Sequence, residues 1–382
     1  MHRHDRLPEP AAEALAHSNR LRQHIEGAID AAGGWIPFSR YMELALYAPG
    51  LGYYTAGSRK LGREGDFTTA PELTPLFGHA LAQQARDLIA AGLPDILEVG
   101  AGSGALAAAV LEELDRLGCL PERYLILELS PELRARERDT LAARVPHLME
   151  RVAWLNQLPP SFRGLVLGNE VLDAMPVEVI RVTADDIEQA GVDRALQWSW
   201  RKAEGEVRAA AEALALPVGY RTEIGLAARA FVRTLGEVLE RGAILLVDYG
   251  FPRPEYYHPQ RSAGTLMCHY RHRAHDDPFH LPGLQDITAH VDFTAMAEAA
   301  HEAGLDIAGY TTQAQLLINL GITELMLRTP PEDAARYLPA AAAVNKLMSP
   351  AEMGELFKAI AFTRDLDEPL RAFRAGDRLH TL

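Results

Sequence analysis

The sequence has few cysteines, no long apolar run and no excess of positive charge, and each absence excludes a class of protein. Cys119 and Cys268 are the only cysteines in 382 residues, so a disulfide framework does not hold the fold. No apolar run approaches the roughly 20 residues that a membrane-spanning helix needs. The formal net charge of -14 argues against a broad basic face that binds nucleic acid.

The sequence does have the composition of an ordinary packed protein. Hydrophobic residues make up 48% of the chain and charged residues 24%, close to average values. The length allows one large α/β domain with insertions, or two domains. The N-terminal MHRHDRLPEPAAEALAH lacks the apolar core of a signal peptide, so we expect a cytoplasmic protein without a membrane span.

Helical patterns dominate before residue 95, which predicts an N-terminal helical region over residues 1–92. Ser39 is expected to cap a helix that ends before Pro49. A Gly-rich, aromatic segment follows and predicts a loop. Thr69-Ala70-Pro71-Glu72 then fits a capping box with proline just inside a helix that reaches about Ala91.

From Asp95 onward, short apolar strands alternate with helical segments. Such alternation predicts a mostly parallel sheet covered by helices on both faces. Residues 177–218 alternate apolar and polar positions, which predicts an antiparallel insertion. Residues 251–292, rich in Pro, His and aromatic residues, predict a long ordered loop. The expected strands are DILEV, RYLILEL, VAWLN, GLVLGN, GAILLVDYG, LDIAGYTT and LFKAIAFTRD.

A glycine loop, Gly100-Ala101-Gly102-Ser103-Gly104, directly follows the first of these strands and opens a helix. The missing side chains let a ligand approach the backbone, and the helix N-terminus supplies free N–H groups. Glu128, followed by Leu129, ends the next strand, where a carboxylate can accept hydrogen bonds from both hydroxyls of a ribose. The pattern therefore predicts a site for a nucleoside cofactor that includes residues 100–104, Glu128 and Leu129.

Glu98, two residues before the loop, favours a cationic cofactor over a dinucleotide. The pyrophosphate of NAD would lie near this turn, where a poorly screened carboxylate repels it. S-adenosylmethionine carries an ammonium and a sulfonium but no phosphate, and no Lys or Arg lies between Asp95 and Asp115 to offset Glu98. We therefore predict an S-adenosylmethionine pocket. The alternatives are a plain nucleotide-binding module, or glycines that only make a tight turn while Glu98 points to solvent.

The sequence Asn169-Glu170-Val171-Leu172-Asp173 ends a later strand and predicts the acceptor side of the site. Ligands of open parallel sheets bind beyond the carboxyl ends of the strands, so Glu170 and Asp173 should rim the same cleft as Gly102. Paired carboxylates can grip the N–H fork of a guanidinium and leave one nitrogen more nucleophilic. Asn169 could hold the cofactor or orient the acceptor.

Each of these acids also has a structural explanation. Asp173 could cap a short helix, and Glu170 could be a surface acid. Asp248 ends a further strand and is expected to face the same cleft as a third catalytic acid, but it could instead form the turn before Gly250.

Two further segments are candidates for ligand contact. Gly65-Asp66-Phe67 could fold over the cofactor as a covering loop, although the capping box already explains Thr69 and Glu72. The segment 251–292 lacks the paired cysteines of a structural zinc site, so no metal is predicted, and its tyrosines could line an acceptor channel or pack the loop down. The residues concerned are Tyr256, Tyr257, Cys268, His269, Tyr270, His272, His275, Asp276 and His280.

Several motifs of residues 34–365, in their order, resemble those of the MidA-like methyltransferases. These are bacterial relatives of the mitochondrial protein-arginine methyltransferase that assists assembly of respiratory complex I. GDFTTAPE, NEVLDA and QDITAHVDF are more specific to that family than the glycine motif. The motifs are WIPFSRYMELALYAPGLGYYT, GDFTTAPELTPLFG, ILEVGAGSG, NEVLDAMPVEV, VDYG and GTLMCHYRHRAHDDPFHLPGLQDITAHVDF.

The resemblance implies an α/β, Rossmann-like class I methyltransferase domain over residues 93–382. Its sheet would be seven-stranded, with an antiparallel hairpin at one edge. Cofactor contacts are implied at Gly100, Gly102 and Glu128, and in the covering loop at Gly65-Asp66-Phe67. NEVLDA is the implied acceptor motif, for an arginine-containing protein substrate such as a respiratory-chain subunit.

The sequence leaves several interpretations of the function open. The leading one is a protein-arginine methyltransferase. A second is a methyltransferase that acts on a small molecule or on another protein residue. A third, from a different class, is a non-catalytic chaperone that keeps the fold and the cofactor pocket. Fold alone does not separate them. The sequence does not fix the oligomeric state, and a homodimer is compatible with it.

Overall fold

The computed structural model describes residues 7–56 and 69–382, which form two compact units. The sequence predicts a division at residue 92 instead, and the two divisions differ because the two insertions belong with the N-terminal region. The first unit, here the insertion unit, comprises residues 1–67, 173–228 and 254–290. The second unit, here the sheet unit, comprises residues 68–172, 229–253 and 291–382.

An eight-stranded sheet forms the centre of the sheet unit. Its strand order is β15-β16-β10-β5-β2-β3-β4, with β14 paired to β10. Strands β10, β5, β2, β3 and β4 are parallel, whereas β16 runs antiparallel to β10 and to β15. The strands are β2 (Asp95–Val99), β3 (Arg123–Leu127), β4 (Val152–Leu155), β5 (Phe162–Asn169), β10 (Leu239–Phe251), β14 (Val291–Asp292), β15 (Asp306–Thr312) and β16 (Phe357–Arg364).

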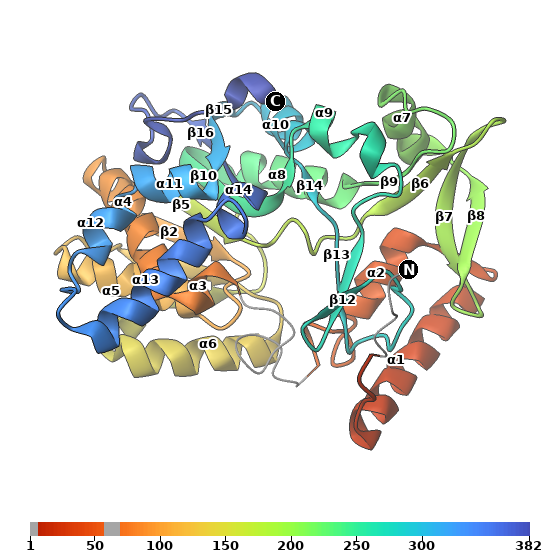
Figure 1. Cartoon of the computed structure of the whole chain (residues 1–382), viewed down its shortest axis with the longest axis horizontal. Helices are drawn as coiled ribbons and strands as arrows, with labels where there is room; N and C mark the ends of the chain where they lie inside the picture. Colours follow the sequence, from red (N-terminus) through yellow and green to blue (C-terminus); the bar gives the residue numbers. More distant parts are fainter. Residues whose placement is uncertain (1–6, 57–68) are drawn as a thin grey trace. The chain divides into compact units, whose positions relative to one another are not determined.

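Helices flank both faces of this sheet (Figure 1), as expected for a Rossmann-like fold. Small residues let two of them approach closely: a Cβ at Gly78 of α4 would lie 2.5 Å from the Cβ of Ala109 in α5. The helices are α3 (Ala70–Leu73), α4 (Pro75–Ala90), α5 (Ala105–Arg116), α6 (Pro131–Arg144), α8 (Leu226–Val238), α10 (Phe293–Glu302), α11 (Gln313–Asn319), α12 (Ile322–Met326), α13 (Ala334–Met348) and α14 (Met353–Leu356).

The helix expected from Thr69 to Ala91 is divided at Thr74. Thr69 makes no side-chain cap hydrogen bond, so the predicted capping box is wrong. Thr74 is extended, with φ -162°, and its hydroxyl accepts a hydrogen bond from the amide of Leu76 at 3.3 Å. A second helix therefore begins at Pro75, where proline has no N–H to continue the first one.

Two small antiparallel sheets build the insertion unit, which confirms the antiparallel insertion. One has the order β1-β7-β6-β9 with β8 paired to β7, and the other has the order β12-β11-β13. The elements are α1 (Ala12–Ala31), β1 (Trp35–Pro37), α2 (Phe38–Tyr47), β6 (Glu178–Val182), β7 (Ile187–Asp193), β8 (Trp198–Lys202), α7 (Gly205–Ala213), β9 (Arg221–Ile224), β11 (Met267–Tyr270), β12 (Arg273–His275) and β13 (Asp286–Thr288), with α9 (Arg253–Tyr256) at its boundary.

The segment 251–292, expected to be a long loop, contains the second of these sheets. Strands β11 and β12 are joined by the turn Arg271-His272, in which both residues have positive φ, 48° and 60°. Tight hairpin turns of this kind usually carry Asn or Gly, so the sequence lacks the usual signal. The segment is ordered, as expected, but part of it forms a small sheet where the sequence predicted a long loop.

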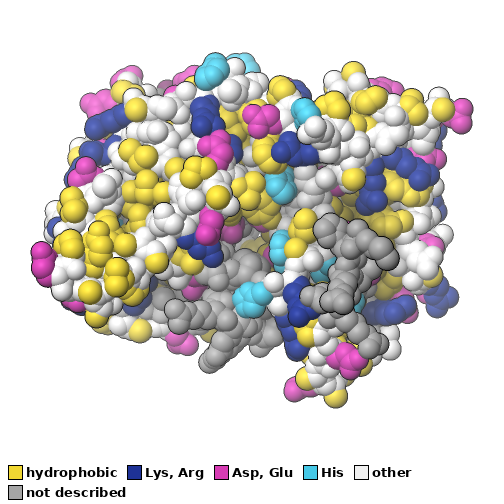
Figure 2. Space-filling model, in the orientation of Figure 1, with side chains coloured by type: hydrophobic (Ala, Val, Ile, Leu, Met, Phe, Trp, Pro, Cys, Tyr) yellow, Lys and Arg dark blue, Asp and Glu magenta, His cyan; other side chains and the backbone are white. Residues whose placement is uncertain are grey.

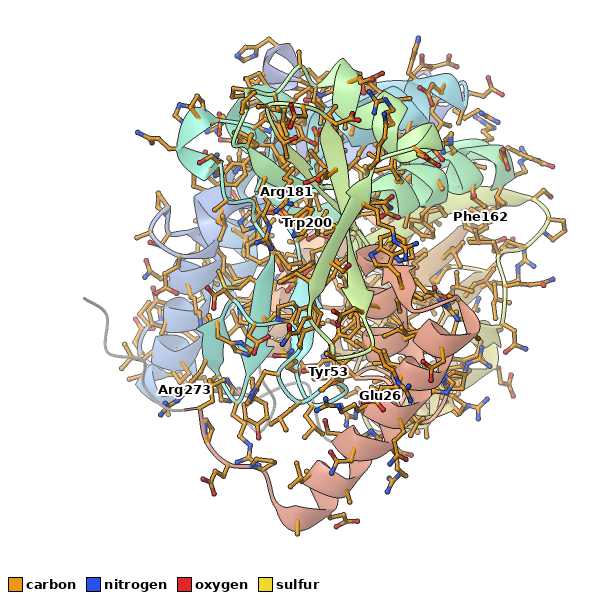
Figure 3. The ribbon with its side chains drawn as sticks, turned by 90° about the vertical axis from the view of Figure 1, so that its right-hand side faces the viewer. Glu26, Tyr53, Phe162, Arg181, Trp200 and Arg273 are labelled. Carbon is orange, nitrogen blue, oxygen red and sulfur yellow. The ribbon has the colours of Figure 1, made fainter. Side chains whose placement is uncertain are left out.

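An aromatic core holds the insertion unit together. The ring of Phe38 lies 4.7 Å from that of Trp198, which also meets Phe279 at 5.1 Å. Arg181 of β6 lies over the ring of Trp200 of β8, 4.2 Å from its centroid (Figure 3). Helix α2 begins at Phe38, so Ser39 is not its N-cap as predicted; the Ser39 hydroxyl donates to Glu178 at 2.5 Å instead.

Two structural features concern membrane-spanning and nucleic-acid-binding proteins, the classes that the sequence argued against. None of the helices in the described ranges has the length and apolarity needed to cross a membrane. Acidic and basic side chains are interspersed on the face shown in Figure 2, which is not the pattern of a basic surface for nucleic acid.

Candidate active site

The glycine loop connects β2 to α5 and depends on glycine for its backbone conformation. Gly100, Gly102 and Gly104 have φ of 67°, 61° and 80°, a region that other residues rarely adopt. A Cβ at Gly104 would also lie 3.0 Å from the Cα of Glu137, so packing against α6 already accounts for this glycine. Its predicted contact with the cofactor, like that of Ala101, stays a prediction.

Glu98 is buried below the end of β2 rather than open to solvent. Its carboxylate is 2% exposed, and its Oε2 accepts a hydrogen bond from the Tyr124 hydroxyl at 2.5 Å. Burial raises the pKa of Glu98 to about 7, partly opposed by the Tyr124 hydrogen bond. The alternative that Glu98 points to solvent is therefore wrong. Its predicted attraction for a cationic cofactor would be stronger above neutral pH.

A second buried acid, Glu137 of α6, lies in the same region and was missed by the sequence analysis. It is 0% exposed, and its Oε2 accepts a hydrogen bond from Trp154 Nε1 at 2.6 Å. Its Oε1 makes no hydrogen bond to the described residues. Burial, reinforced by the charge of Glu128, raises the pKa of Glu137 to about 8. A glutamate in a predicted helix gives no sign of such burial.

Glu137→Gln should make the stability of the protein less dependent on pH. The unfolded chain loses this proton near pH 4.5 and the folded chain near pH 8, so the free energy of unfolding falls as pH rises between these values. The variant should match the wild type near pH 4.5 and exceed it by about 4 kcal/mol at pH 8, since each pKa unit corresponds to about 1.4 kcal/mol. Urea unfolding at both pH values measures the difference.

The matched control is Asp139→Asn, which changes an exposed acid of the same helix. It should shift stability equally at both pH values. A Glu137→Gln variant that is no more stable than the wild type at pH 8 would contradict a raised pKa of Glu137 in the folded protein.

Glu128 and Leu129 lie where the sequence analysis placed them, directly after β3. Glu128 is 9% exposed, and its Oε1 accepts a hydrogen bond from the Ser130 amide at 2.7 Å. Burial raises the pKa of Glu128, opposed by hydrogen bonds from the amides of Ser130 and Leu129. Leu129 is an apolar side chain that is 72% exposed at this edge of the sheet, which suits the face of a nucleobase.

Arg134, a residue that the sequence analysis missed, joins the ends of β3 and β4. Its Nε donates to the carbonyl of Glu128 at 2.6 Å, and its Nη2 donates to the carbonyl of Leu155 at 2.5 Å. Two carbonyls from separate strands thus fix one guanidinium. Arg134 therefore sets the position of the backbone that carries Glu128.

The turn after β5 holds Glu170 in a strained backbone conformation. Its φ is 54°, which costs a non-glycine residue on the order of 1 kcal/mol and is often seen at functional sites. The Glu170 amide donates to the carbonyl of Val247 at 2.8 Å. Its Oε1 accepts from the Ala70 amide at 3.4 Å and from Asn169 Nδ2 at 3.0 Å.

This turn lies against the glycine loop. Strand β5 is the neighbour of β2, and a Cβ at Gly100 would lie 3.3 Å from Cγ2 of Val171. Glu170 precedes Val171 in the chain. Glu170 therefore lies close to the glycine loop, as expected for residues at the carboxyl ends of neighbouring parallel strands.

Asp248 of β10 holds the backbone of this turn. The carboxylate is 1% exposed, and its Oδ2 accepts from the amides of Val171 and Leu172 at 3.1 and 2.8 Å. Its Oδ1 accepts from the Tyr249 amide at 2.9 Å. These contacts give Asp248 a clear structural role, and its catalytic role stays a prediction.

Asp173 opens the next segment of the insertion unit. It is 6% exposed, and its carbonyl accepts a hydrogen bond from the Ala289 amide at 3.0 Å. No helix follows it, since residues 172–175 form turns and bends. The alternative that Asp173 caps a short helix is therefore wrong, and its role as a second acid stays a prediction.

Of the remaining candidates, Gly65-Asp66-Phe67 lies outside the described residues. In the segment 251–292, Tyr256 and Tyr270 are each 3% exposed, as expected for side chains that pack the segment down. The rings of His275 and His280 lie 5.6 Å apart, and burial lowers the pKa of both. No group of metal-binding side chains is found in the part of the chain that the structure describes.

The residues around the loop fit S-adenosylmethionine better than a dinucleotide. The acids Glu98 and Glu128 flank it, and no basic residue between Asp95 and Asp115 could hold a phosphate. Together with a sheet of this strand order, this loop defines an S-adenosylmethionine-dependent methyltransferase. Residues 76–311, more than half of the chain, match the Methyltransf_28 family of S-adenosyl-L-methionine-dependent methyltransferases, and the chain belongs to this family.

Known proteins are similar to the chain over nearly its whole length. A Drosophila melanogaster protein named protein arginine methyltransferase NDUFAF7 homolog, mitochondrial, is 28% identical over 93% of this chain and 87% of its own. Its mouse relative, named protein arginine methyltransferase NDUFAF7, mitochondrial, is 29% identical over 91% and 85%. A crystal structure of a Burkholderia thailandensis protein bound to S-adenosyl-homocysteine is 52% identical, with a TM-score of 0.94 over 99% of this chain and 100% of that one.

Proposed function

We propose that this methyltransferase modifies arginine side chains of a protein. The observation that carries the proposal is the similarity, over 93% and 91% of the chain, to relatives named protein arginine methyltransferase. The position of Glu170 adds support, because a carboxylate held beside the glycine loop suits a guanidinium acceptor. From the family resemblance we propose a respiratory-chain subunit as the substrate and an assembly role for complex I. We also propose a cytoplasmic setting.

On this proposal, the carboxyl ends of β2 and β3 hold the cofactor. When bound, S-adenosylmethionine supplies a methyl group on a positively charged sulfur. Glu128 would accept hydrogen bonds from the ribose hydroxyls, and Leu129 would lie against the base. Gly100 and Gly102 would let the cofactor approach the backbone, because they have no side chains.

Glu170 then positions the acceptor. Its carboxylate accepts hydrogen bonds from the guanidinium, which orients one nitrogen for in-line attack, and it takes up the proton that this nitrogen loses. Asn169 orients Glu170 through the hydrogen bond from its Nδ2. Asp248 keeps the turn in place through the amides of Val171 and Leu172. We propose Asp173 as the second acid of the motif.

Labelled methyl transfer tests the proposal. The purified protein and S-adenosylmethionine with a labelled methyl group are added to a lysate of cells that lack the protein, and the labelled species are examined by mass spectrometry. We expect label on arginine of one or a few proteins. Label on a small molecule or on another residue would favour the second interpretation. No label, with intact cofactor binding, would favour the assembly chaperone.

A further inference from the structure

The side chain of Glu72 points to the glycine loop instead of capping its own helix. The Ser103 hydroxyl donates a hydrogen bond to Glu72 Oε1. Thr69, the expected capping partner, makes no such contact. Ser103 in turn accepts a hydrogen bond from the amide of Ala105 at 3.3 Å. The carboxylate is therefore fixed to the loop through a hydroxyl that also contacts the first amide of α5.

Helix α3 is held between the glycine loop and the turn after β5. Ala70 is 0% exposed, and its amide donates to Glu170 Oε1 at 3.4 Å. At its other end, the extended backbone of Thr74 ends the helix. Glu72 is therefore directed to the loop by contacts on both sides.

The order of the strands places Glu72 opposite the ribose anchor. Strand β2 lies between β3 and β5, Glu128 follows β3, and the turn that contacts α3 follows β5. Because ligands of open parallel sheets lie beyond the carboxyl ends of the strands, a cofactor whose ribose lies at Glu128 would extend its amino-acid end across the loop toward β5. That end carries an α-ammonium, which is best paired with a carboxylate.

Glu98 is a poorer partner for this ammonium. Its Oε2 is taken by Tyr124, and the side chain is 2% exposed on the face of β2 that also carries Ile96. Glu72 is only half-buried and contacts the loop at the Ser103 hydroxyl. No Lys or Arg of residues 95–115 competes with a cation for its carboxylate.

We propose that Glu72 binds the α-ammonium of the cofactor, with Ser103 orienting its carboxylate. Glu72 would then be the binding residue for the amino-acid end, as Glu128 is for the ribose. The proposed ion pair involves only the cofactor and does not depend on the identity of the methyl acceptor. A failure to methylate arginine would therefore not contradict it.

Calorimetry with two ligands tests the pairing. S-adenosyl-homocysteine has the amino-acid end, whereas 5′-methylthioadenosine has the same nucleoside and sulfur without it. Glu72→Gln should weaken binding of S-adenosyl-homocysteine about tenfold or more and change binding of 5′-methylthioadenosine less than about threefold. The second ligand also shows whether the variant is folded around an intact pocket.

A matched variant and a third ligand separate the charge from the geometry. Ser103→Ala removes the hydrogen bond to Glu72 but keeps the carboxylate, so we expect a loss of at most about threefold for S-adenosyl-homocysteine. A deaminated analogue of S-adenosyl-homocysteine lacks the ammonium, so removing the carboxylate in Glu72→Gln breaks no ion pair. The analogue should therefore bind the wild type and Glu72→Gln equally, which completes a double-mutant cycle. Equal losses for all ligands in Glu72→Gln, or no loss for S-adenosyl-homocysteine, would overturn the proposal.

Discussion

Gly102→Val is expected to abolish binding of S-adenosylmethionine while the protein stays folded. Gly102 has φ 61° in the loop that follows β2, and a β-branched side chain disfavours that conformation by roughly 1–2 kcal/mol. The added side chain would also occupy the space that a ligand needs above the backbone. We expect affinity to fall by more than about 100-fold, or ~3 kcal/mol, measured by calorimetry with S-adenosylmethionine.

Gly118→Val is the matched control for backbone strain. Gly118 has φ 66°, lies just beyond α5 and would place a Cβ in open space. It should lose a similar amount of stability and keep its affinity for the cofactor. Affinity within about threefold of wild type in Gly102→Val would remove Gly102 from the site. Tight binding of NADH, with no detectable binding of S-adenosylmethionine, would contradict the assignment of the cofactor.

Glu170→Gln should lose methyl transfer and keep cofactor binding. Glutamine can still accept the hydrogen bonds from the Ala70 amide and from Asn169, so the turn should persist. It lacks the charge that holds a guanidinium and the basicity that takes up a proton. We expect the rate of labelled methyl transfer to fall by about 100-fold or more, with the affinity for S-adenosyl-homocysteine within about threefold.

Asp365→Asn is a suitable control, because Asp365 is an exposed acid of the same unit with a similarly positive φ of 49°. It should behave as wild type in both assays. Unchanged turnover in Glu170→Gln would exclude Glu170 from the acceptor site. A parallel loss of S-adenosyl-homocysteine binding would assign the carboxylate to the cofactor instead.

The sheet could be predicted from the sequence because its strands are apolar runs buried on both faces. DILEV, for example, is buried along its whole length as β2, and such runs bounded by helices have few alternative structures. The second small sheet was missed because its strands are short and its turn, Arg271-His272, adopts positive φ without glycine. The break at Thr74 was missed, although Pro75 signals it.

The positions of candidate residues could be predicted where they depend on local sequence, and their contacts with a cofactor stay predictions. The glycine loop and Glu128 are fixed by their places at strand ends, and their positions agree with the prediction. The contacts of Glu72 with Ser103 and of Glu137 with Trp154 join residues that the sequence separates. Neither periodicity nor composition carries that information. Burial of Glu98 follows from its place in DILEV, but its hydrogen bond from Tyr124 likewise joins residues that the sequence separates.

The two compact units are interleaved along the chain, and this affects how the protein is made. The apolar side of α1, with Leu21, Ile25 and Ile29, packs in one core with Ile287, which is translated much later. At typical elongation rates, the ribosome needs roughly 10–40 s to pass from residue 67 to residue 290. During that interval the nascent N-terminal segment lacks its partners. Helices α1 and α2 therefore expose binding surface for molecular chaperones before the unit can close.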